Sequence, residues 1–538
     1  MNQIPANGPA KGENDATDAT DPRVARRNKL NQLIERGIDP YGSRFDNRTF
    51  VSECRSRKNE VKFVTAEGQT LELPDFDAAD PDAPIDYRQW KTDNGPGAET
   101  GPIVRVAGRV MLCRPTGKLI FLNIRDWTGN IQIFVGKKQV GDDDFDLAKL
   151  FDLGDLVAAE GRLGRTNTGE LTVFAEKLFM MTKMLEPAPE KHAGMTNLDL
   201  RQRMRYADLA FNDGVMDTFM DRTRIIKAIR QTLDDDQFCE VEGPTLHTIA
   251  GGAAARPFIT HHNTLDMQLY MRIALELHLK RLMVGGMERV YELGRVYRNE
   301  GLSPRHNPEF TMLEAYQAYG DYEVMMDLTE RLIASAIEAT GGNYQREFDG
   351  RMIDFSVPFQ RETYAHLFHK ATGIDPSDDN AVIEFAKGIG IKTDGKHLDV
   401  VRNEIFEEKV EDSLDGPIFV IDYPASICPL TKRKRDNPEV AERFELFILG
   451  MEIANAYTEL NDPDLQEALF ETQLSGQEEE DSMAKMDHDF VRALRYAMPP
   501  AGGLGVGIDR LVMLLTGQRS IRDVILFPVL RPETDSAK

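Results

Sequence analysis

Cysteine and long hydrophobic runs are both scarce in this sequence. Its four cysteines lie far apart and form no CxxC pair, so we expect neither a zinc site nor a disulfide framework. No apolar run approaches the ~20 residues that cross a bilayer. The start of the chain lacks the apolar segment of a secretory signal, and we expect residues 1–21 to form a disordered tail. These absences predict a cytoplasmic protein with no membrane segment.

An excess of positive charge and the common phosphate-binding motifs are also missing. Neither GxxxxGK[ST] nor GxGxxG occurs, so a P-loop or Rossmann nucleotide site has no support. The formal net charge of -24 counts weakly against RNA binding, because phosphate contacts require lysine and arginine. Total charge does not exclude a local basic patch, so local motifs have to decide.

A chain of 538 residues is too long for one ordinary core, and we expect two or more domains. Residues 22–102 are predicted to contain a basic helix at Arg23–Arg36 and then, from about residue 55 to 101, an irregular acidic insertion. Residues 103–185 contain five short runs of alternating character, which predict a closed barrel of the OB-fold kind. Another all-β module is the alternative. The runs are IVRVAGRV, LIFLNIRD, NIQIFV, LVAAEGRL and LTVFAEKL.

Prolines 187 and 189 indicate a linker over residues 186–212, and residues 213–535 form the largest predicted domain. Its first element is a helix at about Val215–Gln237, where apolar residues recur at helical spacing. Strands and helices then alternate irregularly. The predicted fold class is α+β: an N-terminal OB-fold β-barrel, then a domain on an antiparallel sheet with flanking helices.

Residues 289–319 are predicted to form two strands joined by a polar loop. Alternation places Phe310, Glu314 and Tyr316 on one face of the second strand, so a ring, a carboxylate and a phenol would line one wall. Arg298, at the end of the first strand, could hold a phosphate or carboxylate with a two-pronged fork. A surface hairpin with salt bridges is the alternative from this stretch alone.

Residues 443–461 show a second strand–turn–strand pattern. Three residues of its second strand share one face: Asn455, Tyr457 and Glu459. Such groups need partners if they are buried. Glu445 and Glu452 lie beside the turn and could together hold a hard cation such as Mg²⁺. Simple alternation puts Glu452 opposite to Asn455, so a bulge or the turn must redirect one of them.

Residues 501–515 combine alternating glycines with a following helix. Gly503, Gly505 and Gly507 alternate with apolar residues, as in a strand that passes very close to another group. The apolar run after Arg510 is typical of a helix. Close approach beside a fixed guanidinium suits a bound nucleotide, and tight packing between elements is the alternative.

Together these three stretches resemble the class II aminoacyl-tRNA synthetases. YRNE at residues 297–300 matches the aromatic-Arg-x-Glu core of one signature motif, and GLGVGIDR at 503–510 matches the glycine-strand-Arg motif. The stretch ending in Pro244 corresponds to the first motif, which builds a dimer interface in this family. A barrel before the catalytic domain is similar to the lysine, aspartate and asparagine subgroup. Within it, GGAAARPF, RHNPEFT and NAYTELND resemble the lysyl-tRNA synthetases.

The resemblance implies that the chain joins L-lysine to tRNA(Lys) through a lysyl-adenylate, with ATP and Mg²⁺, as a homodimer. The implied ATP ligands are Arg298, Glu300, His306, Asn307, Phe310 and Arg510, of which Arg298 and Arg510 are the catalytic cations. The implied lysine ligands are Gly252, Glu276, Glu314, Tyr316, Asn455, Tyr457 and Glu459. The implied metal ligands are Glu445 and Glu452. Charge agrees with lysine, since Glu459 could receive its ammonium, whereas an aspartate pocket would need converging cations.

The barrel carries a separate candidate site. Phe121 and Gln132 lie eleven positions apart (132 minus 121) on neighbouring predicted strands. The resemblance implies that they stack on and hydrogen-bond the central anticodon uridine, a usual route to single-stranded RNA. Arg125 is expected to supply charge for phosphates, and Glu170 is a candidate for the third anticodon base. A core phenylalanine is the alternative for Phe121 alone.

Two other functions remain open. One is a non-catalytic tRNA-binding or regulatory paralogue, which the presence of Arg298, Glu300 and Arg510 disfavours. The other is a ligase that attaches lysine to a protein, which the N-terminal barrel disfavours. Lysine-dependent exchange of pyrophosphate into ATP, followed by transfer to tRNA, separates all three.

Overall fold

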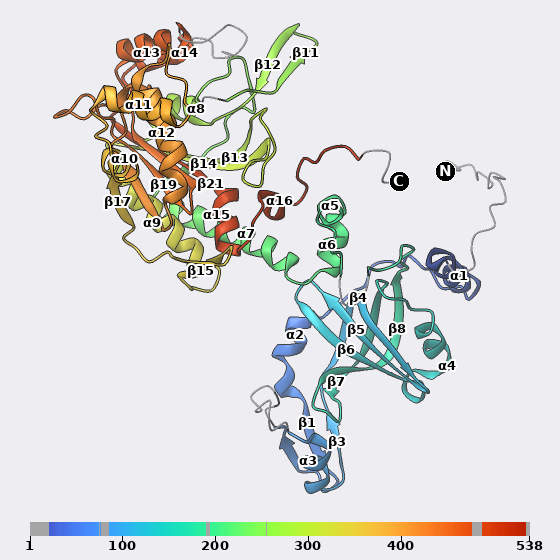
Figure 1. The fold of residues 1–538 in the computed structure, drawn as a ribbon. Coiled ribbons are helices and arrows are strands. Elements are labelled where there is room, and N and C mark those ends of the chain that lie inside the picture. The colour runs from blue at the N-terminus through green and yellow to red at the C-terminus, as the bar shows by residue number, and fades with distance from the viewer. Residues whose placement is uncertain are drawn as a thin grey trace. The chain divides into compact units, whose positions relative to one another are not determined.

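The chain divides into two compact units, which Figure 1 colours from blue to red along the sequence. One unit contains residues up to Thr196 with 210–212, and the other contains 197–209 with those from Asp213 onward. Apart from Asp21, whose carboxylate caps the first helix, the predicted tail lies outside the described residues. No described helix is long and apolar enough to cross a membrane. The computed structural model describes residues 21–74, 76, 85–189, 194–253, 255–475 and 487–533.

Five strands of the first unit close into a barrel in the order β4-β5-β6-β8-β7, so the predicted OB-fold is confirmed. Neighbouring strands are antiparallel except β6 and β8. The alternating apolar residues point inward and share one core. The bounds are β4 (Ile103–Thr116), β5 (Leu119–Asp126), β6 (Gly129–Gly136), α4 (Lys137–Ala148), β7 (Leu156–Arg165) and β8 (Leu171–Thr182).

Within the acidic insertion, the described residues 62–74 and 85–100 contain regular strands and a helix, so the prediction of an irregular segment is wrong for them. Three antiparallel strands in the order β2-β1-β3 form a small sheet with one short helix, next to the barrel in Figure 1. Its strands are too short for a visible alternation, and the buried rings of Phe63 and Tyr87 pack on Trp90. The bounds in this region are α1 (Pro22–Glu35), α2 (Val51–Ser56), η1 (Lys58–Glu60), β1 (Lys62–Thr65), β2 (Thr70–Glu72), α3 (Tyr87–Asp93) and β3 (Gly97–Thr100).

The predicted linker over residues 186–212 also needs correction. Its later part forms α5 (Leu198–Arg203) and α6 (Arg205–Phe211), and residues 197–209 belong to the second unit. Arg205 is buried, pairs with Asp208 at 2.5 Å, and donates to the carbonyl oxygens of Arg522 and Leu526. Polar contacts of a buried ion pair thus hold these helices in the second unit. The apolar periodicity of a sequence does not predict contacts of this kind.

Eight strands of the second unit form one sheet in the order β17-β18-β19-β20-β21-β14-β13-β9. All neighbours are antiparallel except the two outermost pairs, β17 with β18 and β9 with β13. The bounds are β9 (Cys239–Glu240), β13 (Arg289–Tyr297), β14 (Glu309–Ala318), β17 (Gln360–Thr363), β18 (Ile418–Ile421), β19 (Arg443–Ile448), β20 (Met451–Thr458) and β21 (Ala501–Gly507). The predicted antiparallel sheet is therefore confirmed in its central strands.

Three helices, α7 (Val215–Asp235), α9 (Tyr322–Glu338) and α15 (Ile508–Thr516), share the main core with the central strands. Leu313 and Ala315 of β14 point into this core, whereas Tyr316 belongs to a different apolar cluster with α8 (Glu276–Val284) and α14 (His488–Leu494). Because side chains alternate along β14, one face of the strand packs into the main core. The opposite face, which carries Tyr316 and is called the second face below, can line a site.

The remaining elements surround these layers. Helices α10, α11 and α12 pack together in a third cluster with β18. The bounds are β10 (Leu246–His247), β11 (Ile259–His262), β12 (Met267–Met271), β15 (Gln345–Phe348), β16 (Arg351–Asp354), α10 (Tyr364–Thr372), α11 (Asp379–Gly388), α12 (Leu398–Lys409), η2 (Glu411–Ser413), η3 (Ala425–Ile427), α13 (Pro463–Ser475) and α16 (Ile521–Val524).

Candidate active site and nucleic-acid interface

Two adjoining cavities of about 210 Å³ and 790 Å³ lie on the second face of β14, β20 and β21. Arg298, Glu452 and Asn455 border both of them. Phe310 lines the smaller cavity, and Glu314 and Tyr316 line the larger one, so the predicted wall along β14 is confirmed. The residues on one face of β14 therefore line two neighbouring cavities.

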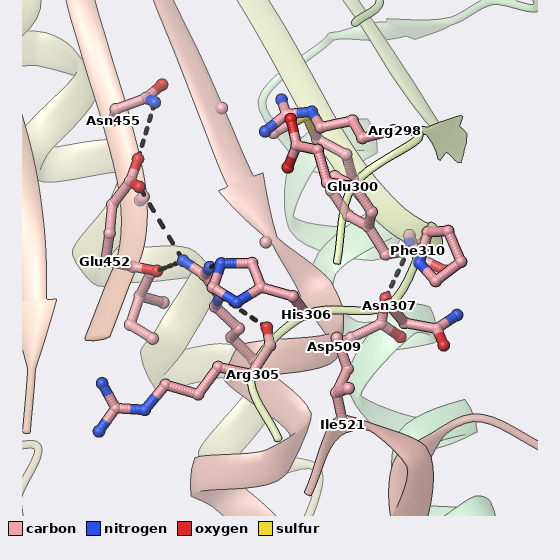
Figure 2. Close-up of a pocket in the computed structure, with 18 of the residues that line it drawn as sticks. Arg298, Glu300, Arg305, His306, Asn307, Phe310, Glu452, Asn455, Asp509 and Ile521 are labelled. Atoms are coloured by element: carbon pink, nitrogen blue, oxygen red, sulfur yellow. Dashed lines mark hydrogen bonds and ion pairs between the residues drawn. The ribbon is translucent and has the colours of Figure 1, made fainter. Parts of the chain in front are cut away.

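The smaller cavity brings together aromatic and cationic groups (Figure 2). The Arg298 guanidinium lies 5.2 Å from the ring centroid of Phe310. Arg510, in the first turn of α15, donates to the carbonyl oxygen of Glu452 at 2.7 Å. Ring and fixed guanidinium groups are what a base and its phosphates require. All six candidate ATP ligands line this cavity: Arg298, Glu300, His306, Asn307, Phe310 and Arg510.

His306 and Asn307 hold defined hydrogen-bonding states in this cavity. The Arg510 guanidinium lies 2.9 Å from Nε2 of His306, and a guanidinium only donates, so this nitrogen accepts. Burial and the charge of Arg510 lower the pKa of His306, which agrees with a neutral ring. The Asn307 amide donates to the carbonyl oxygen of Glu309 at 2.7 Å. Its buried Oδ1 accepts no hydrogen bond from the described part of the chain, which leaves an acceptor for a ligand.

A β-bulge resolves the geometric conflict between Glu452 and Asn455. The β19–β20 register shifts between Leu446 and Phe447, so Glu445 pairs with Asn455 while Glu452 pairs with Phe447. The bulge turns Glu452 toward Asn455, whose amide donates to its carboxylate at 2.9 Å. The prediction that a bulge or turn redirects one residue is confirmed, and Glu445 and Glu452 both line the larger cavity.

The carboxylates beside the bulge fit a hard cation. Tyr423 donates to Glu445 at 2.7 Å, and Arg443 pairs with the same carboxylate. Burial raises the pKa of Glu445, Arg443 opposes the rise, and the charge of Glu452 adds to it. Burial and the charge of Glu445 also raise the pKa of Glu411 to about 8. Among the described residues no group of three or more metal-ligating side chains occurs, so a Mg²⁺ ion here would need phosphate and water oxygens as well.

The larger cavity is acidic at its inner end. Glu276 and Glu314 line it, and both are buried. Glu459 is fully buried and does not line the cavity, but its Oε1 lies next to Gly503, which does. This Oε1 accepts no hydrogen bond from any described residue. A buried carboxylate oxygen without a donor indicates a place for a ligand cation.

A lysine that was not predicted as a site residue balances part of this charge. Lys280 is fully buried, lies 2.5 Å from Glu276 and also pairs with Glu459. Burial alone would lower the pKa of Lys280, but the charges of the two carboxylates outweigh burial and raise it. Burial and the charge of Glu276 raise the pKa of Glu314 to about 7. Lys280 lies four residues after Glu276 on α8, and this helical spacing is the sequence signal that could have identified it.

The glycines of β21 are required by close approach. A Cβ on Gly503 would overlap Oε1 of Glu459 and the ring of Tyr316, and a Cβ on Gly505 would lie 3.0 Å from Oδ1 of Asn455. Gly252 has φ +86°, and its Cβ would lie 3.1 Å from that of Ala274. The remaining candidate lysine ligands, Gly252, Glu276, Glu314, Tyr316, Asn455 and Tyr457, all line the larger cavity.

A third cavity, of about 1000 Å³, lies on the outside of the barrel. Phe121 and Gln132 both line it, from the paired strands β5 and β6, so Phe121 is not a core residue. The Gln132 amide donates to Glu170 at 2.6 Å, and Glu170 also lines the cavity. Arg125 does not, because it lies at the far end of β5, where it donates to Asn130 at 3.0 Å. Arg114, Arg162 and Arg165 bring positive charge to the cavity instead.

The catalytic architecture and the barrel together define a class II tRNA synthetase. The family model described as "tRNA synthetases class II (D, K and N)" matches residues 197–531, and one described as "OB-fold nucleic acid binding domain" matches 104–181. A lysine–tRNA ligase of Staphylococcus aureus strain MW2 is 46% identical over 520 residues, which are 96% of this chain and 99% of that protein. The lysine–tRNA ligase of strain MRSA252 is 45% identical over the same shares. The chain belongs to the lysine–tRNA ligase family.

Proposed function

We propose that the chain activates L-lysine with ATP and transfers it to tRNA(Lys). A lysine carboxylate oxygen bonds to the α-phosphorus while the bond to the bridging oxygen breaks, which forms lysyl-adenylate and pyrophosphate. A hydroxyl of the terminal ribose of tRNA then takes the lysyl group and AMP leaves. The observation that favours lysine as the substrate is the buried Oε1 of Glu459, which lies beside an acidic cavity and accepts no hydrogen bond from any described residue.

Charge balance supports lysine as the substrate. Three carboxylates are buried here, those of Glu276, Glu314 and Glu459. Among the described residues, one ammonium pairs with them, that of Lys280, which contacts Glu276 and Glu459. Lysine brings two ammonium groups, which would neutralise the two excess charges when all three acids are ionised, while its own carboxylate would face Arg298, which lines both cavities. In this assignment Glu276 and Glu314 hold the α-ammonium, and Glu459 with Tyr316 receives the ε-ammonium. Gly252, Asn455 and Tyr457 complete the walls of the pocket.

ATP is assigned to the smaller cavity. Phe310 stacks on adenine, Arg298 contacts the α-phosphate where it borders the lysine pocket, and Arg510 contacts the outer phosphates. Glu300, His306 and Asn307 orient the nucleotide, Asn307 through its open Oδ1. Glu445 and Glu452 would hold Mg²⁺, which supplies positive charge to the phosphates when it is bound.

The chain's own contribution is to bring the reactants together and to stabilise charge. Two substrates held in adjoining cavities avoid most of the entropy cost of a bimolecular encounter. The guanidinium groups of Arg298 and Arg510 are held in place before reaction and face the charge that develops on the phosphates. No nucleophilic side chain is needed, because the substrate's carboxylate is the nucleophile.

The barrel is assigned to the anticodon of tRNA(Lys). Phe121 would stack on the central base, Gln132 would hydrogen-bond it, and Glu170 would read the third base. Arg125 is outside the cavity, so its charge would at most act on tRNA phosphates next to the bound anticodon. The local excess of arginine at this cavity removes the objection that the net charge raised.

We also propose that the chain works as a homodimer in the cytoplasm. The motif that ends at Pro244 is the one that builds dimers in this family, and Leu246, two residues after it, is an exposed apolar residue. The four cysteines are free thiols, as a reducing compartment favours.

Two consecutive assays test the proposal. Lysine should drive exchange of labelled pyrophosphate into ATP without tRNA, and the enzyme should then charge tRNA(Lys). Absence of exchange would favour a non-catalytic tRNA-binding protein. Exchange without tRNA charging, but with transfer of lysine to a protein, would favour a protein ligase.

A further inference from the structure

The insertion supplies the second wall of the barrel cavity. Besides barrel residues, the cavity is lined by Phe63 of β1, Lys91 of α3, and Gly97 and Glu99 of β3. Although the insertion is acidic in sequence, the lining contains more cations than anions. The cations are Lys91, Arg114, Arg162 and Arg165, and the anions are Glu99 and Glu170. This surface has the charge that a nucleic-acid backbone requires.

The insertion also contacts the turn between β7 and β8 through hydrogen bonds and an aromatic ring. Oε2 of Glu99 accepts a hydrogen bond from the backbone N–H of Arg165 at 2.7 Å, and Lys91 donates to Oδ1 of Asn167 at 2.9 Å. The Phe76 ring lies 4.8 Å from the Arg165 guanidinium and fills the space beside Gly169. This turn is one of the loops that bind oligonucleotides in OB-folds. The insertion therefore fixes a loop of the barrel at the edge of the candidate RNA site.

Lys91 presents a charge to the cavity. Its side chain is 26% exposed, and its ammonium lies 4.4 Å from the ring centroid of Tyr87. An ammonium carries three N–H groups, of which Asn167 receives one. The nearest carboxylate oxygen of Glu99, at 3.9 Å, is beyond hydrogen-bonding distance. The ammonium can therefore hold Asn167 and a phosphate oxygen at once.

We propose that the described strands and helix of the insertion (β1, α3 and β3) are part of the tRNA-binding surface and that Lys91 contacts a phosphate of the anticodon loop. The inference rests on the proposed function, because the barrel cavity is taken as the anticodon site. The contact is to the backbone and adds affinity without selecting a base. The insertion thus extends the barrel's binding surface beyond the pair Phe121 and Gln132.

Binding of a labelled anticodon stem–loop of tRNA(Lys) to the full-length chain tests this, at several salt concentrations. Lys91→Met keeps an apolar side chain against Tyr87 and removes the charge. The Kd should rise roughly three- to fivefold, as for one partly exposed ion pair. The slope of log affinity against log salt should become shallower by about 0.7, the value for one single-strand phosphate contact. Lys91→Arg should restore both.

Arg88→Met is the matched control, because Arg88 is exposed on the same helix and does not line the cavity. It should leave the Kd and the slope unchanged. Wild-type binding by Lys91→Met would overturn the inference. So would weaker binding with an unchanged salt slope, since Lys91 would then act only through Asn167. Pyrophosphate exchange is measured in parallel: its absence in the wild type refutes the proposed function, whereas a normal rate with unaltered binding by Lys91→Met refutes only the role of Lys91.

Discussion

Gly503 provides a graded test of the lysine pocket. In Gly503→Ala the new Cβ would overlap Oε1 of Glu459 and the ring of Tyr316, so the carboxylate must move. If Glu459 receives the substrate ammonium, the loss should be that of one buried charged partner, about 2–5 kcal/mol. The corresponding fall in kcat/KM for lysine is roughly 30-fold or more.

Two other glycines of the same strand calibrate the effect. The Cβ of Gly505→Ala would lie 3.0 Å from the Asn455 amide oxygen, and that of Gly507→Ala would meet nothing nearer than 3.6 Å. Pyrophosphate exchange at varied lysine should therefore show a large rise in the KM for lysine at 503, a smaller rise at 505 and none at 507. Equal effects of all three, or a Gly503→Ala enzyme with a normal KM for lysine, would refute this geometry.

Three further predictions concern the other parts of the site. Arg510→Ala should fold normally but lose adenylate formation, by about 3 kcal/mol or more in the transition state, and near-normal exchange would eliminate the assignment. Phe121→Ala should weaken charging of tRNA(Lys) by about 1–3 kcal/mol and spare lysine activation; equal losses in both steps would argue against it. Glu314 must be ionised to bind an ammonium, and its pKa is raised to about 7. Burial also raises the pKa of Glu459 to about 8. The kcat/KM for lysine should therefore fall as the pH drops through about 8 and about 7, and Glu314→Gln should remove only the part of the fall near pH 7.

Local pattern predicted the strands that build the site. Period-two alternation placed Phe310, Glu314 and Tyr316 on one wall, and the alternating glycines indicated the close approach that Gly503 shows. The conflict between Glu452 and Asn455 predicted a bulge without locating it, because a register shift depends on the partner strand. Local sequence patterns thus predicted which residues share a strand face, but they did not predict the register in which two strands pair.

Long-range contacts explain the parts that sequence did not predict. In the described part of the insertion, Phe76, Lys91 and Glu99 contact the β7–β8 turn, more than sixty positions further along the chain. Arg125 lies on the same strand as Phe121 but outside the cavity. Alternation predicts the face on which a residue lies, but it does not predict how far along the strand a cavity extends. Such contacts leave no periodic signal.

The charge of Glu459 tests the central claim, recognition of lysine by a buried acid, most directly. Glu459→Gln keeps the shape of the side chain beside Gly503 and removes its charge. Measured by pyrophosphate exchange, kcat/KM for lysine should fall roughly 30-fold or more, while the KM for ATP should change little, because ATP is assigned to the neighbouring cavity. A Glu459→Gln enzyme that activates lysine almost normally would contradict the account, since the ammonium would then be received elsewhere.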